Sequence, residues 1–275
     1  MIVNEGGEFQ LYRKGDLAYL QAPLLSDSCL VDHAFSTRLG GCSSGAMSWL
    51  NTAFHTGDQV KHVLENRRRF MDSFGYDYKG MVSCIQVHGT DMAVFNNSHR
   101  GEGAQPDTGQ QTCDALITEE PGLVLSAYAA DCMLIYVVST RKPLIALAHA
   151  GWRGTLGNIG GKVVRYLQQR YLIEPDQLLV ALSPAICAQC YQVDETVAAQ
   201  FRAAGWDNPT CLTPGSAEGA YHLDLALINS QQLLQAGIRP RNLAYNHWCT
   251  ACNPELFYSY RLGKGITGRM IGFLA

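Results

Sequence analysis

The stretch YAADCMLIYVVSTRKPLIALAHAGWRGT, residues 128–155, contains two apolar runs separated by a short polar segment. Each run has the length of a buried β-strand, and the polar segment between them is typical of a turn. Cys132 opens the first run and His149 lies near the end of the second. The stretch therefore predicts neighbouring buried strands that carry a thiol and an imidazole at their ends, as packing groups, as metal ligands, or as a nucleophile and its base.

Further apolar runs predict strands on both sides of this stretch. We expect strands at residues 33–37, 80–89, 91–95, 113–118, 122–131, 178–186, 256–261 and 269–274. Helices are expected at residues 58–75, 159–171, 194–204 and 224–236, where apolar periodicity or capping residues indicate them. A purely parallel α/β sheet would place a helix after nearly every strand. The mixture instead predicts a mixed α/β (α+β) fold, with layered mixed β-sheets flanked by helices.

The composition is that of a globular protein with a large core. The chain has 275 residues, of which 47% are hydrophobic and 16% charged, and we expect one domain covering residues 1–275. The formal net charge of -3 gives no basic excess that would indicate nucleic acid or an anionic membrane as a partner. We therefore expect neither nucleic acid nor a membrane as a partner. We also expect a monomer or weak oligomer.

The start of the chain, MIVNEGGEFQLYRK, lacks the basic segment and apolar stretch of a secretory signal. No segment approaches the roughly 20 apolar residues that span a bilayer. We therefore expect a cytoplasmic protein, whose ten cysteines are reduced.

Three residues at strand ends form a candidate metal site. His88 follows an apolar strand in IQVHGTD, and it joins Cys132 and His149 as a third soft or borderline ligand beside small residues. Two histidines and one cysteine leave a fourth position open, which is typical of catalytic zinc. The spacing is too long for a chelating loop, so the fold must bring the three together. A buried cysteine with two core histidines remains an equal alternative on this evidence alone.

Two other interpretations compete for the cysteines. The pairs CAQC (187–190) and CTAC (249–252) resemble halves of a four-thiolate zinc site, but the 58 residues between them exceed the roughly 15–20 of compact zinc ribbons. We therefore favour four reduced thiols that hold no metal. Alternatively, Cys132 is a nucleophile with a histidine as its base and Asp131 orienting the imidazole.

Two segments offer groups that bind anions. The turn FSTRLGG (35–41) with the following Asn51 supplies Ser36, Arg38 and backbone N–H groups, although it matches no nucleotide-binding motif. The segment HAGWRGT (149–155) adds Arg153 and the N–H groups that open the next helix, at the same sheet edge as His149. The alternative for both arginines is a solvated or ion-paired surface role.

An ordered series of motifs resembles a known family. The motifs are STRLGG, LN before GD, QVHG, CDALIT, ADC, HAGWRGT, SPAI with CYQV, and FYSYR with TGRM. From about residue 33 onward, the chain is similar to the YfiH-like, laccase-domain family of purine nucleoside phosphorylases, formerly named multicopper polyphenol oxidases. The resemblance implies a mixed α/β domain and one zinc ion (Zn2+) bound by His88, Cys132 and His149.

The resemblance also implies an activity. It implies phosphorolysis of adenosine, inosine and related nucleosides to the base and sugar 1-phosphate, together with adenosine deamination. Arg38, Ser36 and Asn51 are then expected to line the pocket. We assign phosphate binding to Arg38 and Arg153, and we assign stabilisation of an oxocarbenium-like sugar to Asp131.

The sequence departs from the family pattern at several positions. ADCLP is replaced by ADCML, GPAI by SPAI, LNL by LNT and YEV by YQV. None of these changes removes a proposed metal ligand, but they affect pocket shape and substrate choice. Three alternatives remain: a peptidoglycan-precursor editing hydrolase with Cys132 as nucleophile, a copper-dependent polyphenol oxidase, and a protein with a structural zinc only. Eight scattered histidines without an H-x-H pair argue against several copper centres.

Overall fold

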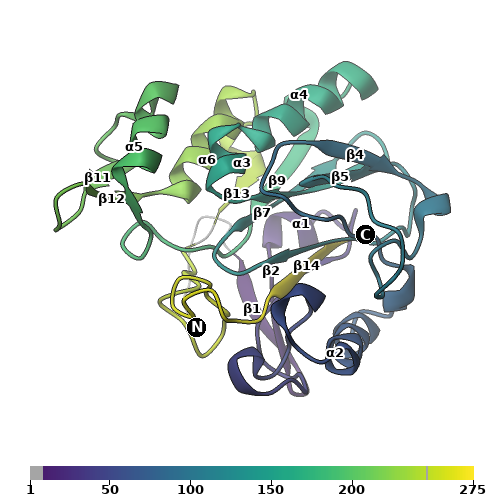
Figure 1. Cartoon of the computed structure of the whole chain (residues 1–275). Helices are drawn as coiled ribbons and strands as arrows, with labels where there is room; N and C mark the ends of the chain where they lie inside the picture. The colour runs from purple at the N-terminus through teal and green to yellow at the C-terminus, as the bar shows by residue number, and fades with distance from the viewer. Residues whose placement is uncertain (1–8, 246) are drawn as a thin grey trace.

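Two stacked β-sheets form the centre of the molecule and helices cover their outer faces (Figure 1). The computed structural model describes residues 9–245 and 247–275. A five-stranded antiparallel sheet has the order β1-β2-β3-β14-β6, and a six-stranded mixed sheet has the order β13-β9-β7-β8-β5-β4. The strands of the first sheet are Gln10–Lys14, Leu17–Gln21, His33–Ser36, Met270–Leu274 and Leu125–Ala129. Those of the second are Leu243–Ala244, Leu178–Leu182, Met133–Ser139, Ile145–Ala150, Ala115–Thr118 and Met92–Phe95.

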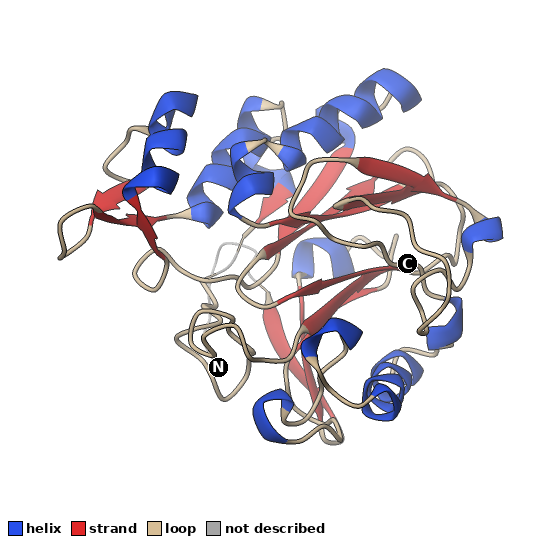
Figure 2. Cartoon of the chain, in the orientation of Figure 1, coloured by secondary structure: helices blue, strands red, loops and turns tan. Residues whose placement is uncertain are grey.

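Helices α4 and α6 lie on one side of this pair of sheets and α2 lies on the other (Figure 2). Apolar side chains of α4 and α6 pack on the outer face of the six-stranded sheet, and those of α2 pack on the outer face of the five-stranded sheet. The helices are α1 (Pro23–Ser26), α2 (Val60–Asp72), α3 (Trp152–Leu156), α4 (Ile159–Tyr171), α5 (Glu195–Phe201) and α6 (Leu225–Gln235). The predicted mixed α/β fold with layered sheets is therefore confirmed.

A small lobe stands beside these layers. Its three strands, in the order β10-β12-β11, are Gln192–Asp194, Ala220–Leu223 and Leu212–Pro214. Helix α5 packs on this sheet through Ala198 and Phe201. The sequence predicted the helix of the lobe but not its sheet, because three- and four-residue strands carry too few positions to show alternation.

The strand pair predicted from residues 128–155 is present as β7 and β8. These strands are antiparallel neighbours in which Leu134 lies opposite His149. Every residue of both strands is buried, because one face meets the five-stranded sheet and the other meets α4. The predicted helices at 159–171 and 224–236 are also present, the second with Asp224 accepting a hydrogen bond from Leu227 N as its cap.

Two predicted strands are wrong. Residues 80–89 form only isolated bridges at Val82 and Ile85, because their backbone groups bond singly to several neighbouring segments. Residues 256–261 are buried in part but lie in no ladder, and Tyr258 N donates to Met270 Sδ. Residues 81–84 and 256–259 are buried without forming a ladder, whereas Ile85 and Val87 are exposed.

His33 in β3 gives the fold a dependence on pH. The ring is fully buried, and its Nε2 accepts a hydrogen bond from Ala22 N at 2.8 Å, so the neutral form fits the site. Burial lowers the pKa of His33 to about 4, against a smaller opposing effect of Asp32. Below pH 6.5 the unfolded chain therefore binds a proton that the folded chain does not.

We expect the free energy of unfolding to fall by roughly 3 kcal/mol from this group as the pH drops from 6.5 to 4. Urea unfolding at both pH values measures the loss in the wild type and in a His33→Gln variant. The variant keeps an acceptor for Ala22 N but does not titrate, so its loss should be smaller by that amount. Equal losses in the two proteins would contradict the assignment.

Candidate metal centre and its cavity

The structure brings together the three residues predicted as metal ligands. Cys132 directly precedes β7, His149 lies in the adjacent strand β8, and His88 lies in the turn after residues 80–87. One ligand atom from each lies within 4.8 Å of the other two. The two imidazole rings meet edge to face, with their centroids 4.8 Å apart. Two imidazoles and a thiol at this separation can bind a metal ion and leave a position open.

Asp114, which no sequence motif marks as a functional residue, holds two of these predicted ligands in place. It is fully buried at the start of β5, and its Oδ1 lies 2.9 Å from His149 Nδ1. It also accepts hydrogen bonds from the backbone N–H groups of Val87, His88 and Gly89. Because Nδ1 of His149 contacts this carboxylate, Nε2 is the ring nitrogen left for the metal. The only sequence signal was an acid at the edge of the apolar run CDALIT.

The backbone is strained at two positions of the centre. His88 has φ 62 and Asp131 has φ 81, in the left-handed region that side chains other than glycine seldom occupy. Such conformations persist only where the surroundings enforce them, and they concentrate at functional sites. Asp114 enforces the first through its three N–H contacts. The second is held by Thr250 Oγ1 and Arg261 N, which donate to the Asp131 carboxylate at 2.6 and 2.7 Å.

Gly151 allows the ligands to approach the start of α3. A Cβ atom at this position would lie 2.8 Å from His88 Cδ2 and 3.0 Å from Cys132 Sγ. The backbone there is extended, with φ -75, so steric space and not conformation requires glycine. This explains the glycine that follows His149 in HAGWRGT.

Charge at the centre favours a thiolate. Burial acts to raise the pKa of Cys132, but the neighbouring His149 and His88 lower it below its usual value. Conversely, burial acts to lower the pKa of His149, while Cys132 and Asp114 raise it. Both shifts favour a thiolate beside a protonated imidazole, and the thiolate is the form that binds metals.

A cavity of about 850 Å³ opens over the three ligands. This is the size of sites that bind small organic ligands. Among the described residues, four arginines and one carboxylate, that of Asp131, contribute to its wall. The arginines are Arg67, Arg153, Arg261 and Arg269, and the aromatic residues of the wall are Phe54, Tyr128, Trp152, Tyr191 and Tyr260. Guanidinium groups suit an anion, and aromatic faces suit a planar ring.

Only some of the residues predicted to line the pocket lie at the cavity. Asp131 and Arg153 line the cavity, whereas Ser36, Arg38 and Asn51 are not among the described residues of its wall. The Arg38 guanidinium lies over Tyr258 and Trp49 and donates to Pro254 O. Ser36 Oγ accepts from Ile271 N in the sheet.

Asn51 connects to the cavity through another residue. Its buried side chain accepts a hydrogen bond from Arg269 N at 2.9 Å and donates to Asp58. Arg269 itself lines the cavity, so Asn51 orders the backbone that carries a wall residue. Arg67, Arg261 and Arg269 could not be predicted as wall residues, because they come from distant segments that share no motif.

Comparison with known proteins gives consistent relatives. A family model described as "Multi-copper polyphenol oxidoreductase laccase" matches residues 32–275. The chain is 39% identical over 240 residues to "Purine nucleoside phosphorylase YlmD" of Geobacillus stearothermophilus, covering 87% of this chain and 88% of that protein. It is 30% identical over 230 residues to "Adenosine deaminase RL5" of an unknown prokaryotic organism, covering 83% and 87%. The crystal structure of YlmD from G. stearothermophilus superposes with a TM-score of 0.90 at 36% identity, covering 97% and 98%.

Proposed function

We propose that this chain, which belongs to the family described as multi-copper polyphenol oxidoreductase laccase, is a zinc-dependent purine nucleoside phosphorylase. The relative named purine nucleoside phosphorylase YlmD supports this activity. Its substrates are adenosine, inosine and related nucleosides, which react with phosphate to give the base and sugar 1-phosphate. The observation that carries this proposal is the cavity itself, which combines arginine and aromatic side chains beside an open three-ligand metal site. Adenosine deamination at the same site is a second activity, supported by the relative named adenosine deaminase.

The donor set fits zinc. His88, Cys132 and His149 would hold the ion, and Asp114 would orient His149 from behind. When bound, zinc supplies a Lewis acid that polarises an oxygen or nitrogen of the substrate. Copper oxidase chemistry of the laccase type needs several copper centres rich in histidine. The other metal-compatible group among the described residues consists of cysteines only, which disfavours that alternative.

The cavity wall supplies the remaining roles. Arg153 is exposed at the start of α3, and we assign it to phosphate in place of Arg38, whose guanidinium lies against Tyr258 and Trp49 outside the wall. The aromatic side chains of the wall would stack on the purine. Asp131 places a carboxylate beside Cys132, where it would stabilise positive charge on the sugar as the base leaves. Ser36 and Asn51 would support the cavity from outside it.

An assay of inosine with phosphate tests the proposal. With inosine as substrate, the metal-loaded protein should release hypoxanthine only when phosphate is present. With adenosine as substrate, phosphorolysis in the presence of phosphate should release adenine, and deamination in its absence should give inosine. Arg153→Gln should raise the KM for phosphate about tenfold, because a charge-assisted contact worth about 1.4 kcal/mol is lost. Arg165→Gln, at an exposed position of α4, serves as the matched control.

The same assay addresses the alternative of a peptidoglycan-precursor hydrolase. Muropeptide precursors are incubated in parallel, and cleavage of the peptide is followed by chromatography. Cleavage of the precursor together with no base release from any nucleoside would replace the phosphorylase proposal by the hydrolase.

A further inference from the structure

Two cysteine-containing loops meet at one edge of the six-stranded sheet. The first, Cys187–Cys190, follows β9, and the second, Cys249–Cys252, follows β13. These strands are parallel neighbours, with Leu243 opposite Val180. The carboxyl ends of neighbouring parallel strands lie at the same end of the sheet, so the loops that follow them lie side by side. The long spacing between the two C-x-x-C pairs therefore does not separate them in space.

Backbone contacts continue this pairing into the loops. Ala185 forms a parallel bridge with Cys249, and Thr250 N donates to Ala185 O at 3.1 Å. The two segments therefore still run in parallel just before the cysteine pairs, although this bridge lies one residue out of the register of β9 and β13. The position of the four thiols follows from this pairing of two chain segments.

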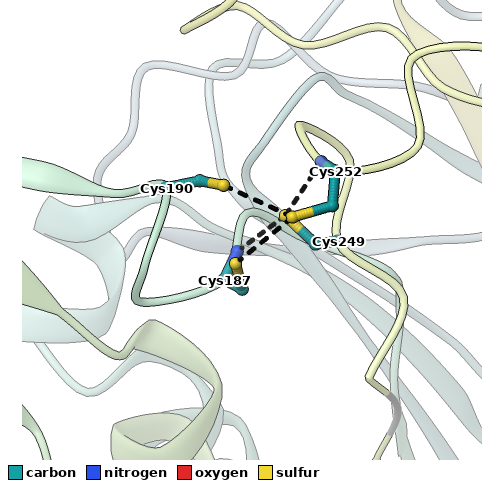
Figure 3. Close-up of side chains that lie close together, drawn as sticks. All are labelled: Cys187, Cys190, Cys249 and Cys252. Carbon is teal, nitrogen blue, oxygen red and sulfur yellow. Dashed lines mark hydrogen bonds between the residues drawn. The ribbon is translucent and has the colours of Figure 1, made fainter.

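The four sulfur atoms have the separations of a tetrahedral site (Figure 3). Cys190 and Cys252 Sγ are 3.4 Å apart, Cys187 and Cys252 Sγ are 3.9 Å apart, and all four ligand atoms lie within 4.8 Å of one another. A zinc–sulfur distance of about 2.3 Å in a tetrahedron places the sulfurs about 3.8 Å apart. The four cysteines are free thiols, and these separations exceed the roughly 2.05 Å of a disulfide.

Hydrogen bonds at one sulfur favour the charged form that a metal needs. Cys249 Sγ accepts from Cys187 N at 3.2 Å and from Cys252 N at 3.4 Å. One donor comes from each loop, so both backbones converge on this buried sulfur. Donation to a thiolate stabilises its negative charge.

We propose that Cys187, Cys190, Cys249 and Cys252 bind a second zinc ion in a closed, four-thiolate structural site. The set contrasts with the open centre at His88, Cys132 and His149, since it offers four protein ligands and leaves no position for substrate. Cys252 is exposed, which gives the ion a path from solvent. This proposal departs from the prediction that these cysteines are thiols without a metal.

A metal ion at this second site would stabilise one wall of the cavity. Tyr191 follows Cys190 directly and lines the cavity. Ile186 N donates to Asp131 O, and Thr250 Oγ1 donates to the Asp131 carboxylate, so each loop also holds the residue beside Cys132. An ion that joins the loops would therefore keep Asp131 and Tyr191 at fixed positions without contacting the substrate.

Metal content of the purified full-length protein tests the proposal independently of turnover. Protein purified under reducing conditions should contain about two zinc ions per chain by elemental analysis, one for each site. His88→Ala, which changes only the open centre, should retain about one. Cys252→Ser should also retain about one, whereas Cys29→Ser, at an exposed thiol outside both groups, should retain both.

Cobalt substitution identifies the ligands in a variant whose cysteine loops are intact. His88→Ala loaded with Co2+ should show the intense sulfur-to-cobalt charge-transfer absorption of four thiolates. Adding Cys252→Ser to this variant should reduce that absorption. A folded His88→Ala protein without bound metal would overturn the proposal, as would iron in place of zinc or disulfides among the four cysteines in freshly purified protein. Loss of phosphorolysis with two zinc ions still bound would instead contradict only the proposed function.

Discussion

Replacing His88 by alanine is expected to remove the metal from the open centre and to lower kcat/KM for inosine phosphorolysis about a thousandfold or more. Two ligands, Cys132 and His149, then remain, whereas catalytic zinc sites use three protein ligands. The loss of the Lewis acid removes several kcal/mol of transition-state stabilisation, which corresponds to this factor. Elemental analysis and steady-state kinetics on the same preparation measure both effects.

His62→Ala is the matched control for this substitution. His62 lies on α2, is 22% exposed and is not among the described residues of the cavity wall. It should leave metal content and turnover unchanged. Full turnover by a His88→Ala protein whose open centre holds no metal would rule out the metal centre and would favour Cys132 as a nucleophile.

Substitution of Asp114 by asparagine is expected to weaken metal binding at the open centre about 10- to 100-fold, the usual effect of losing a carboxylate behind a ligating histidine. The amide has one oxygen where Asp114 has two acceptors, so its NH2 group would face the donors from His149 or the backbone of residues 87–89. A buried donor left without an acceptor costs about 1–3 kcal/mol, so the melting temperature should fall as well. Competition with a chromogenic chelator measures the affinity.

Asp91→Asn provides the comparison, because Asp91 is exposed and contacts Asp114 through its backbone carbonyl. The control should keep the affinity of the wild type. If Asp114→Asn binds zinc as tightly as the wild type, the carboxylate neither orients His149 nor supports the turn at His88.

The fold was predictable where burial and regular pairing coincide. The apolar runs of β7 and β8 are long enough to be read as buried strands, and the four-residue apolar repeat of α4 identifies the helix that covers them. Residues 80–89 also contain several apolar residues, but their backbone groups bond singly to different segments, which hydrophobicity does not encode. The β1–β2 hairpin and the small lobe were missed because their strands are short or largely exposed.

The candidate site was predictable only in part. Cys132 and His149 could be paired because their strands are adjacent in sequence, and His88 was found because it also follows an apolar run. Asp114 was missed because its role depends on the β5–β8 register, which sets Ala115 opposite Ala148. The four cysteines of the loops after β9 and β13 were set aside because sequence spacing hides parallel pairing.

The position of β14 has a consequence for how the protein is made. This strand lies between β3 and β6 and pairs with both, yet β3 ends at Ser36 and β14 begins only at Met270. During synthesis on the ribosome, β1, β2 and β3 emerge first. They cannot pair with the rest of their sheet until β14 has been synthesised. Pairing over such a sequence distance is slow and leaves strand edges uncovered meanwhile. The nascent chain should therefore depend on chaperones, and a premature stop before Met270 should yield insoluble protein.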